Sequence, residues 1–147
     1  MRFVLGFVMA FGAAAAAMAC GGGESVPETE VAVVFREWEI GVEPAVVRAG
    51  DVRFGVSNEG AVGHNLVVVK SDLPPGELPV SEAGAVDTSK LNVSGGAGPF
   101  APGTSVPGGE GFGTGLSAGK YVLLCDVVAG GESHYRNGMF VGFLVEP

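Results

Sequence analysis

Several short segments of the chain alternate apolar residues with polar or small ones, and this period of two is that of a β-strand. In residues 51–58, for example, Val52, Phe54 and Val56 fall on one face of such a strand. No segment beyond the first 20 residues has the period of a helix. The 26 Gly and 9 Pro residues supply turns between strands. We therefore expect an all-β domain, a β-sandwich of about six to eight strands.

The expected strands fall into two groups, separated by a long middle segment. They cover residues 31–40, 44–49, 51–58, 64–70, 120–126 and 139–146. Residues 71–118 hold most of the prolines and show little periodicity. We expect long Gly/Pro-rich loops there, with a short helix near residues 81–90 and one or two short edge strands.

The N-terminus has the features of an export signal. Residues 1–19 begin with Met1-Arg2, continue with apolar and small residues, and end directly before Cys20. A segment this short predicts a cleaved signal peptide rather than a membrane span. The Cys after small residues resembles the bacterial lipoprotein signal, which implies cleavage before Cys20 and a lipid on its sulfur. The alternative is an ordinary secretory signal in which Cys20 is incidental.

These features divide the chain into a signal peptide (1–19), a flexible tether (20–30) and one domain (31–147). The tether is small and acidic in composition, as flexible linkers often are. The lipoprotein resemblance implies an exported protein, anchored by lipid to the cell envelope on the periplasmic or outer face of a membrane. The net charge of −8 argues against a nucleic-acid partner, because such binding requires cationic side chains to neutralise phosphates.

The residues that bind soft metals are few and form one set. After Cys20, the chain contains only one Cys, two His and one Met, namely Cys125, His64, His134 and Met139. Two imidazoles, a thiolate and a weak axial thioether are the ligand set of a blue-copper site. Each of these residues taken singly is more often structural, so the prediction rests on the whole set. These four residues suffice for one copper ion, so we expect a single ion in the protein.

The order of the four residues supports this prediction. His64 begins one expected strand, Cys125 ends another, and Met139 begins the last. His134 lies in the loop between Cys125 and Met139, so one loop can bring three ligands to a point beside the end of the strand that carries His64. Ligands on rigid strand ends are preorganised for a metal.

Three stretches of the sequence resemble the cupredoxin family, the group that contains plastocyanin, azurin and pseudoazurin. They are residues 43–54, the tripeptide Gly63-His64-Asn65, and Cys125 together with residues 133–140. The resemblance implies a Greek-key β-sandwich and a type 1 blue-copper site. One departure is the segment between Cys125 and His134, which is longer than in many members; we expect it to bulge out and return.

The resemblance also implies roles for single residues. It makes His64, Cys125, His134 and Met139 the copper ligands, with the carbonyl of Gly63 as a weak axial contact. The residue after the first ligand, Asn65, would tie its segment to the Cys125 loop through hydrogen bonds. The ring edge of His134 would reach the surface and pass the electron.

We therefore expect an electron carrier, not an enzyme, that cycles one copper ion between Cu(I) and Cu(II). Its partners would be redox proteins such as a cytochrome or a membrane oxidoreductase, and the protein would be a monomer. Two alternatives stay open at this point. One is an envelope copper chaperone or storage protein with the same ligands, and the other is a metal-free, lipid-anchored β-sandwich that serves as a binding module.

Overall fold

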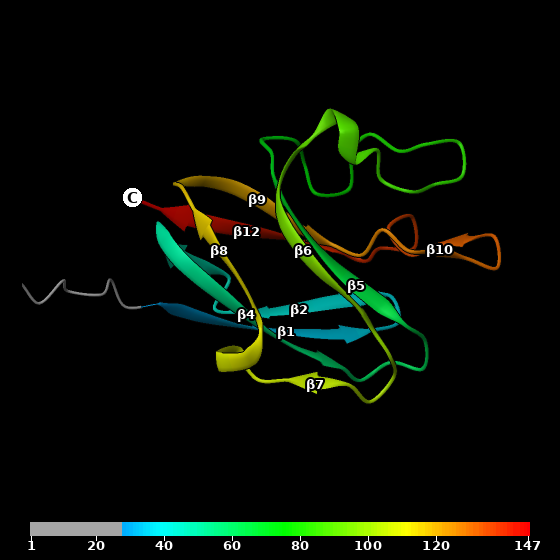
Figure 1. Ribbon diagram of the computed structural model, residues 1–147. Coiled ribbons are helices and arrows are strands. Elements are labelled where there is room, and N and C mark those ends of the chain that lie inside the picture. The colour runs from blue at the N-terminus through cyan, green and yellow to red at the C-terminus, as the bar shows by residue number, and fades with distance from the viewer. Residues whose placement is uncertain (1–27) are drawn as a thin grey trace, which may run out of the picture.

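A computed structural model describes residues 28–147, which form a sandwich of two five-stranded sheets (Figure 1). The first sheet contains β1 (Thr29–Arg36), β2 (Glu39–Glu43), β4 (Gly50–Asn58), β7 (Ser105–Val106) and β8 (Phe112–Leu116). The second contains β3 (Val46–Arg48), β5 (His64–Lys70), β6 (Asn92–Phe100), β9 (Gly119–Leu124) and β12 (Phe140–Glu146). A separate ribbon pairs β10 (Val128–Ala129) with β11 (Glu132–Ser133).

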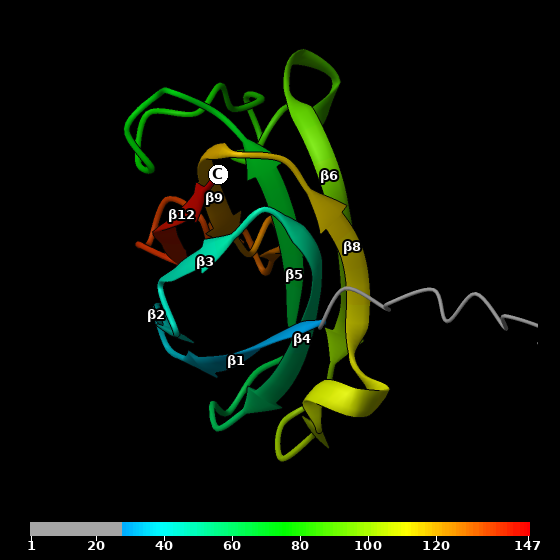
Figure 2. The ribbon, with the colours of Figure 1, turned by 90° about the vertical axis from the view of Figure 1, so that its left-hand side faces the viewer.

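Both sheets are mixed. The first has the order β2-β1-β4-β7, with β8 also paired to β4, and the second has the order β3-β12-β9-β5-β6. The β1–β4 and β12–β3 pairs are parallel, and the other pairs are antiparallel. Figure 2, which looks along the sandwich, shows the two sheets facing each other. The predicted all-β sandwich is confirmed, and eight of the strands have five residues or more.

The main core lies between the two sheets and follows the period-two pattern of the sequence. Val52, Phe54 and Val56 of β4 are buried there, as predicted. Residues Val31, Val33 and Phe35 of β1, Leu66 and Val68 of β5, and Leu123 of β9 join the same cluster. Burial of such side chains contributes about 1.5–3 kcal/mol each, so this layer is the main source of stability.

The outer face of the second sheet is also covered. A second cluster contains Val67, Val69, Leu78, Val86, Val122, Leu124 and Tyr135. Leu78 and Val86 belong to the loop after β5, which lies over the sheet, and the hydroxyl of Tyr135 donates a hydrogen bond to the carbonyl of Pro75. Because both of its faces are covered, β5 is a continuous apolar run rather than an alternating one.

The middle segment differs from its prediction. The expected helix near residues 81–90 is reduced to a 3-10 turn at Thr88–Lys90. The nine-residue β6 replaces much of the expected loop and pairs with β5 as an edge strand. The glycines of β6 gave no strand pattern in the sequence, but the close pairing with β5 requires them. A Cβ at Gly96 would lie only 2.6 Å from the carbonyl oxygen of Leu66, which is too close for any larger residue.

The first predicted strand, residues 31–40, is also wrong in its extent. The chain turns at Glu37-Trp38 and separates β1 from β2 as an antiparallel hairpin. These two residues are not typical turn formers, so local sequence carried no signal of the turn. Strand β1 begins at Thr29, so the last two residues of the predicted tether belong to the sheet rather than to a linker.

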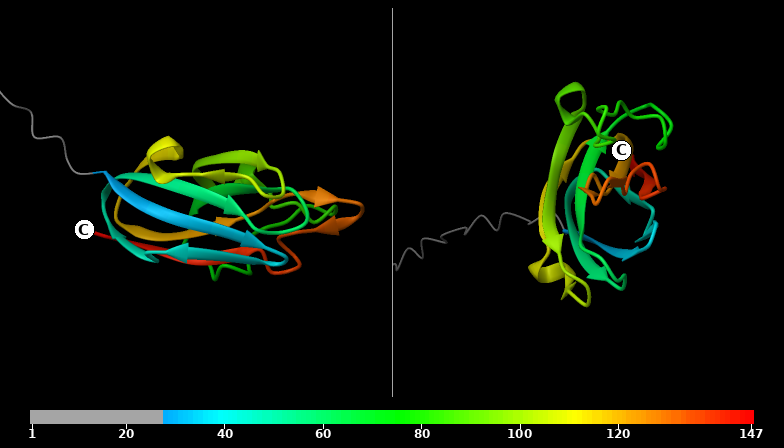
Figure 3. Two further views of the ribbon diagram at one scale, coloured as in Figure 1. Left: turned by 90° about the horizontal axis from the view of Figure 1, so that it is seen from below. Right: turned by 90° about the vertical axis from the view of Figure 1, so that its right-hand side faces the viewer.

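The predicted signal peptide, Cys20 and most of the tether lie outside the described residues. The start of β1 and the C-terminus lie at one end of the sandwich, and the β10–β11 ribbon projects from the other end (Figure 3). Among residues 28–147, no helix has the length and apolar character needed to cross a membrane.

The core assignment predicts the effect of truncating two leucines of the second sheet. Leu123 is fully buried, so Leu123→Ala should lower the free energy of unfolding by about 2–5 kcal/mol, because it removes apolar contacts and leaves a cavity. Leu144 on the neighbouring β12 is 39% exposed, and Leu144→Ala should cost less than about 1 kcal/mol. Urea unfolding of both variants measures the difference, and equal losses would contradict the assignment.

Candidate metal centre

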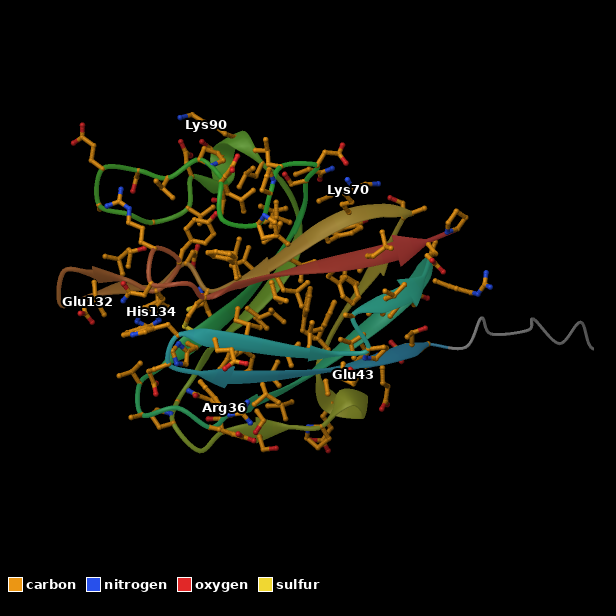
Figure 4. All side chains as sticks on the ribbon, turned by 180° about the vertical axis from the view of Figure 1, so that it is seen from behind. Arg36, Glu43, Lys70, Lys90, Glu132 and His134 are labelled. Carbon is orange, nitrogen blue, oxygen red and sulfur yellow. The ribbon has the colours of Figure 1, made fainter. Side chains whose placement is uncertain are left out.

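His64, Cys125 and His134 form one group, and Figure 4 shows His134 at the end of the sandwich opposite the start of β1. His64 is the first residue of β5, and Cys125 directly follows β9, its antiparallel neighbour. His134 directly follows β11. The ligand atoms of the three side chains lie within 4.8 Å of one another, which makes them a group able to hold a metal ion.

Both imidazoles present the same ring atom to the thiol. The Nδ1 atoms of His64 and His134 are 3.1 Å apart. The Sγ atom of Cys125 lies 3.4 Å from Nδ1 of His134 and 3.9 Å from Nδ1 of His64. His64 and Cys125 are fully buried, and His134 is only 3% exposed. Two nitrogens and one sulfur thus converge on one point, shielded from solvent.

Burial opposes charge on Cys125 and His134 in the metal-free protein. Burial raises the pKa of the Cys125 thiol, which is a free cysteine within the described part of the chain. Burial also lowers the pKa of His134, and the nearby His64 lowers it further. A metal ion that binds here must therefore displace the thiol proton, because the thiolate is the form that binds metal.

Met139 is placed beside the group by its backbone. Its N–H donates a 3.0 Å hydrogen bond to the carbonyl of His134, and its carbonyl accepts a 3.1 Å bond from the N–H of Cys125. Its side chain is fully buried in the same core cluster as Cys125. The axial roles of the Met139 thioether and the Gly63 carbonyl stay predictions.

The long segment between Cys125 and His134 forms the β10–β11 ribbon. The chain thus bulges out and returns there, as the sequence predicted. Gly130 and Gly131 connect its strands with φ values of +60° and +84°, a conformation that glycine adopts without steric cost. The N–H of His134 then donates a 3.0 Å hydrogen bond to the carbonyl of Val127. The ribbon therefore returns the chain to the point where it left and places His134 next to Cys125.

The hydrogen bonds expected of Asn65 are present. Its side-chain amide donates to a carboxylate oxygen of Asp126 at 2.6 Å and accepts from the N–H of Asp126 at 3.1 Å. Its backbone N–H points to the Sγ atom of Cys125 at 3.4 Å. Asn65 thus fixes the start of β5 against the residue that follows Cys125.

Two residues that contact the histidines were missed by the sequence analysis. An oxygen of Glu37 lies 3.3 Å from Nε2 of His64, on the ring edge opposite Nδ1. The ring of Trp38 meets the ring of His134 nearly edge-on, with centroids 5.0 Å apart. The His134 ring was expected at the surface and is instead buried, with Trp38 packed against it. No local pattern marks residues 37 and 38, since their role comes from the β1–β2 turn.

The Asn65 contacts predict a measurable contribution to stability. Asn65→Ala removes two hydrogen bonds and leaves the part-buried N–H of Asp126 without its acceptor, so the metal-free protein should lose about 1–2 kcal/mol of unfolding free energy. Asn92→Ala, at an exposed position at the start of β6, should change it by less than about 0.5 kcal/mol. Equal effects of the two substitutions in urea unfolding would contradict the role of Asn65.

Comparison with known proteins adds evidence at the level of the fold. No protein-family model and no curated protein sequence matches the chain. Solved structures do match, among them auracyanin A, a "blue" copper protein from Chloroflexus aurantiacus, at 21% identity and a TM-score of 0.53, covering 82% of this chain and 100% of that one.

Two further matches agree with it. Rusticyanin from Thiobacillus ferrooxidans aligns at 22% identity with a TM-score of 0.52, covering 83% of this chain and 79% of that one. A reduced auracyanin from Roseiflexus castenholzii aligns at 22% identity with a TM-score of 0.50, covering 82% and 97%. At these identities the likeness establishes the architecture. The chain therefore has the β-sandwich fold of these copper proteins, with a buried His-Cys-His group at one end of its sandwich.

Proposed function

We propose that this protein is a type 1 blue-copper electron carrier that cycles one ion between Cu(I) and Cu(II). The observation that carries the proposal is the convergence of His64 Nδ1, His134 Nδ1 and Cys125 Sγ in a buried site. These donors fit copper, because imidazole suits Cu(II) and thiolate suits Cu(I). Met139 would add the weak axial thioether and Gly63 a weaker carbonyl contact.

The protein's own contribution is to hold these donors still. Two ligands lie next to paired strands, and the third is fixed by the bond from its N–H to the carbonyl of Val127. A site that does not rearrange suits both oxidation states, so an electron can pass with little reorganisation. The apolar surroundings and the hydrogen bonds to the ligands set the reduction potential.

The count of ligands favours a carrier over an enzyme. Apart from Cys20, the predicted mature chain has no Cys, His or Met beyond the four assigned to this site. An oxidase or reductase with a further histidine-bound copper centre would need ligands that the chain does not contain. The partners would be redox proteins such as a cytochrome or a membrane oxidoreductase.

The proposed location is the cell envelope, with a lipid on Cys20 as the anchor and the domain as a monomer. The placement of β1 supports this arrangement, because its start lies at the end of the sandwich opposite His134 (Figure 4). A chain tethered through its N-terminus would present the metal end away from the membrane. The net charge of −8 favours basic surfaces on the partner.

Copper loading tests the proposal directly. The purified protein incubated with Cu(II) should bind one ion and show intense visible absorption from the Cys125 thiolate. Cys125→Ser should remove that absorption, whereas Cys20→Ser, which changes the other cysteine, should keep it. A wild-type protein that stays colourless and binds no copper would refute the proposal and favour the metal-free binding module.

Redox cycling of the same sample separates a carrier from a copper chaperone. A carrier should be reduced and reoxidised repeatedly by a cytochrome while it keeps its copper. A protein that loses its copper to a chelator or an apo-acceptor, and exchanges no electron with the cytochrome, would instead be a chaperone.

The anchor has its own test. If Cys20 is lipidated, the intact mass of the protein from bacterial membranes should exceed that of residues 20–147 by an attached diacylglycerol. Cys20→Ala should move the protein from the membrane to the soluble fraction. An unmodified mass would contradict the anchor and leave the copper proposal unaffected.

A further inference from the structure

The turn between β1 and β2 contacts both histidines of the metal centre. Glu37 approaches the outer ring edge of His64, and Trp38 packs against the ring of His134. The His134 ring thereby packs against two other rings, with centroids 5.0 Å from Trp38 and 5.0 Å from His64. The turn is therefore part of the wall of the site, although none of the predicted ligands belongs to it.

The carboxylate of Glu37 is held in place by backbone groups. Its Oε1 atom accepts hydrogen bonds from the N–H of Ala61 at 2.8 Å and from the N–H of Val62 at 3.1 Å. The same atom faces Nε2 of His64 at 3.3 Å. A fixed anion thus lies beside a fully buried imidazole.

This contact decides which nitrogen of His64 carries the proton. An ionised carboxylate only accepts hydrogen bonds, so the facing Nε2 must be the donor. A histidine binds a metal in its neutral form, which has a single N–H, so a proton on Nε2 leaves the lone pair of Nδ1 free. That Nδ1 faces Cys125 and His134, so the free lone pair points into the metal centre. In the metal-free protein the 3.1 Å contact between the two Nδ1 atoms then has His134 as its donor.

We propose that Glu37 is a positioning residue that holds His64 in the tautomer required for copper and lowers the reduction potential of the site. The first effect follows from the hydrogen bond, since a carboxylate that accepts from a metal-bound histidine orients its ring and strengthens it as a ligand. The second follows from charge, because a nearby anion stabilises Cu(II) more than Cu(I). This inference rests on the proposed copper function and assigns it a further residue.

Glu37→Gln isolates the charge, because the amide has nearly the same shape and its oxygen can still accept from Ala61 and Val62. The copper-loaded variant should keep its visible absorption. At a fixed external potential, its ratio of Cu(I) to Cu(II) should rise about tenfold, which is about 59 mV for one electron. Glu37→Ala, which also removes the hydrogen bond, should in addition weaken Cu(II) binding about 10–100-fold.

Glu59→Gln is the matched control. Glu59 is an exposed carboxylate that pairs with Arg36 at 2.6 Å, and its removal takes away the same charge without touching His64. It should shift the ratio much less than Glu37→Gln does. Equal shifts in the two variants would overturn the inference, while the copper colour of the wild type would still support the proposed function.

A measurement on the metal-free wild type needs neither a variant nor copper. The nitrogen chemical shifts of His64 near pH 7.5 should show a protonated Nε2 and an unprotonated Nδ1. A proton on Nδ1 would overturn the positioning role, whatever the metal experiments show. The protonated Nε2, together with a larger shift in Glu37→Gln than in Glu59→Gln, would establish it.

Discussion

The antiparallel pairing of β5 with β9 is the constraint on which the metal centre depends. It sets the start of β5, where His64 lies, beside the residue after β9, which is Cys125. Asn65 then forms two hydrogen bonds with Asp126, and these bonds hold the start of β5 against the segment that follows β9. A shift of register would move His64 away from Cys125 and break both bonds between Asn65 and Asp126, so the pairing and these bonds together fix the position of two candidate ligands.

The third candidate ligand, His134, is positioned in a different way. The chain leaves Cys125, forms the β10–β11 ribbon and returns, and the N–H of His134 closes the excursion on the carbonyl of Val127. The backbone of Met139 then binds both His134 and Cys125 before β12 begins. A long insertion is compatible with a compact centre because its two ends are tied to each other, and loop length alone costs little free energy once the ends are joined.

Burial gives this end of the sandwich its chemical character. A neutral imidazole and a neutral thiol cost less to bury than the same groups ionised, which is consistent with the lowered pKa of His134 and the raised pKa of the Cys125 thiol. Among the described residues, Glu37 is the one that places a carboxylate oxygen within hydrogen-bond distance of the group, at the outer edge of His64. The His64 imidazole therefore connects the buried donors to a carboxylate at the rim of the site. A change in charge there would act on a bound metal ion without altering the proposed ligands.

The sequence by itself determined the strand faces and the set of soft donors. Val52, Phe54 and Val56 had to share one face because strand side chains alternate, and the four donors could be counted because the domain contains no others. Only the tertiary structure decided that residues 92–100 form a strand and that Glu37 and Trp38 contact the histidines. The Glu37–His64 contact joins residues 27 positions apart, and it depends on how the β1–β2 turn packs against the loop before β5. Local periodicity cannot report such a contact, because it exists only after the sheets have assembled.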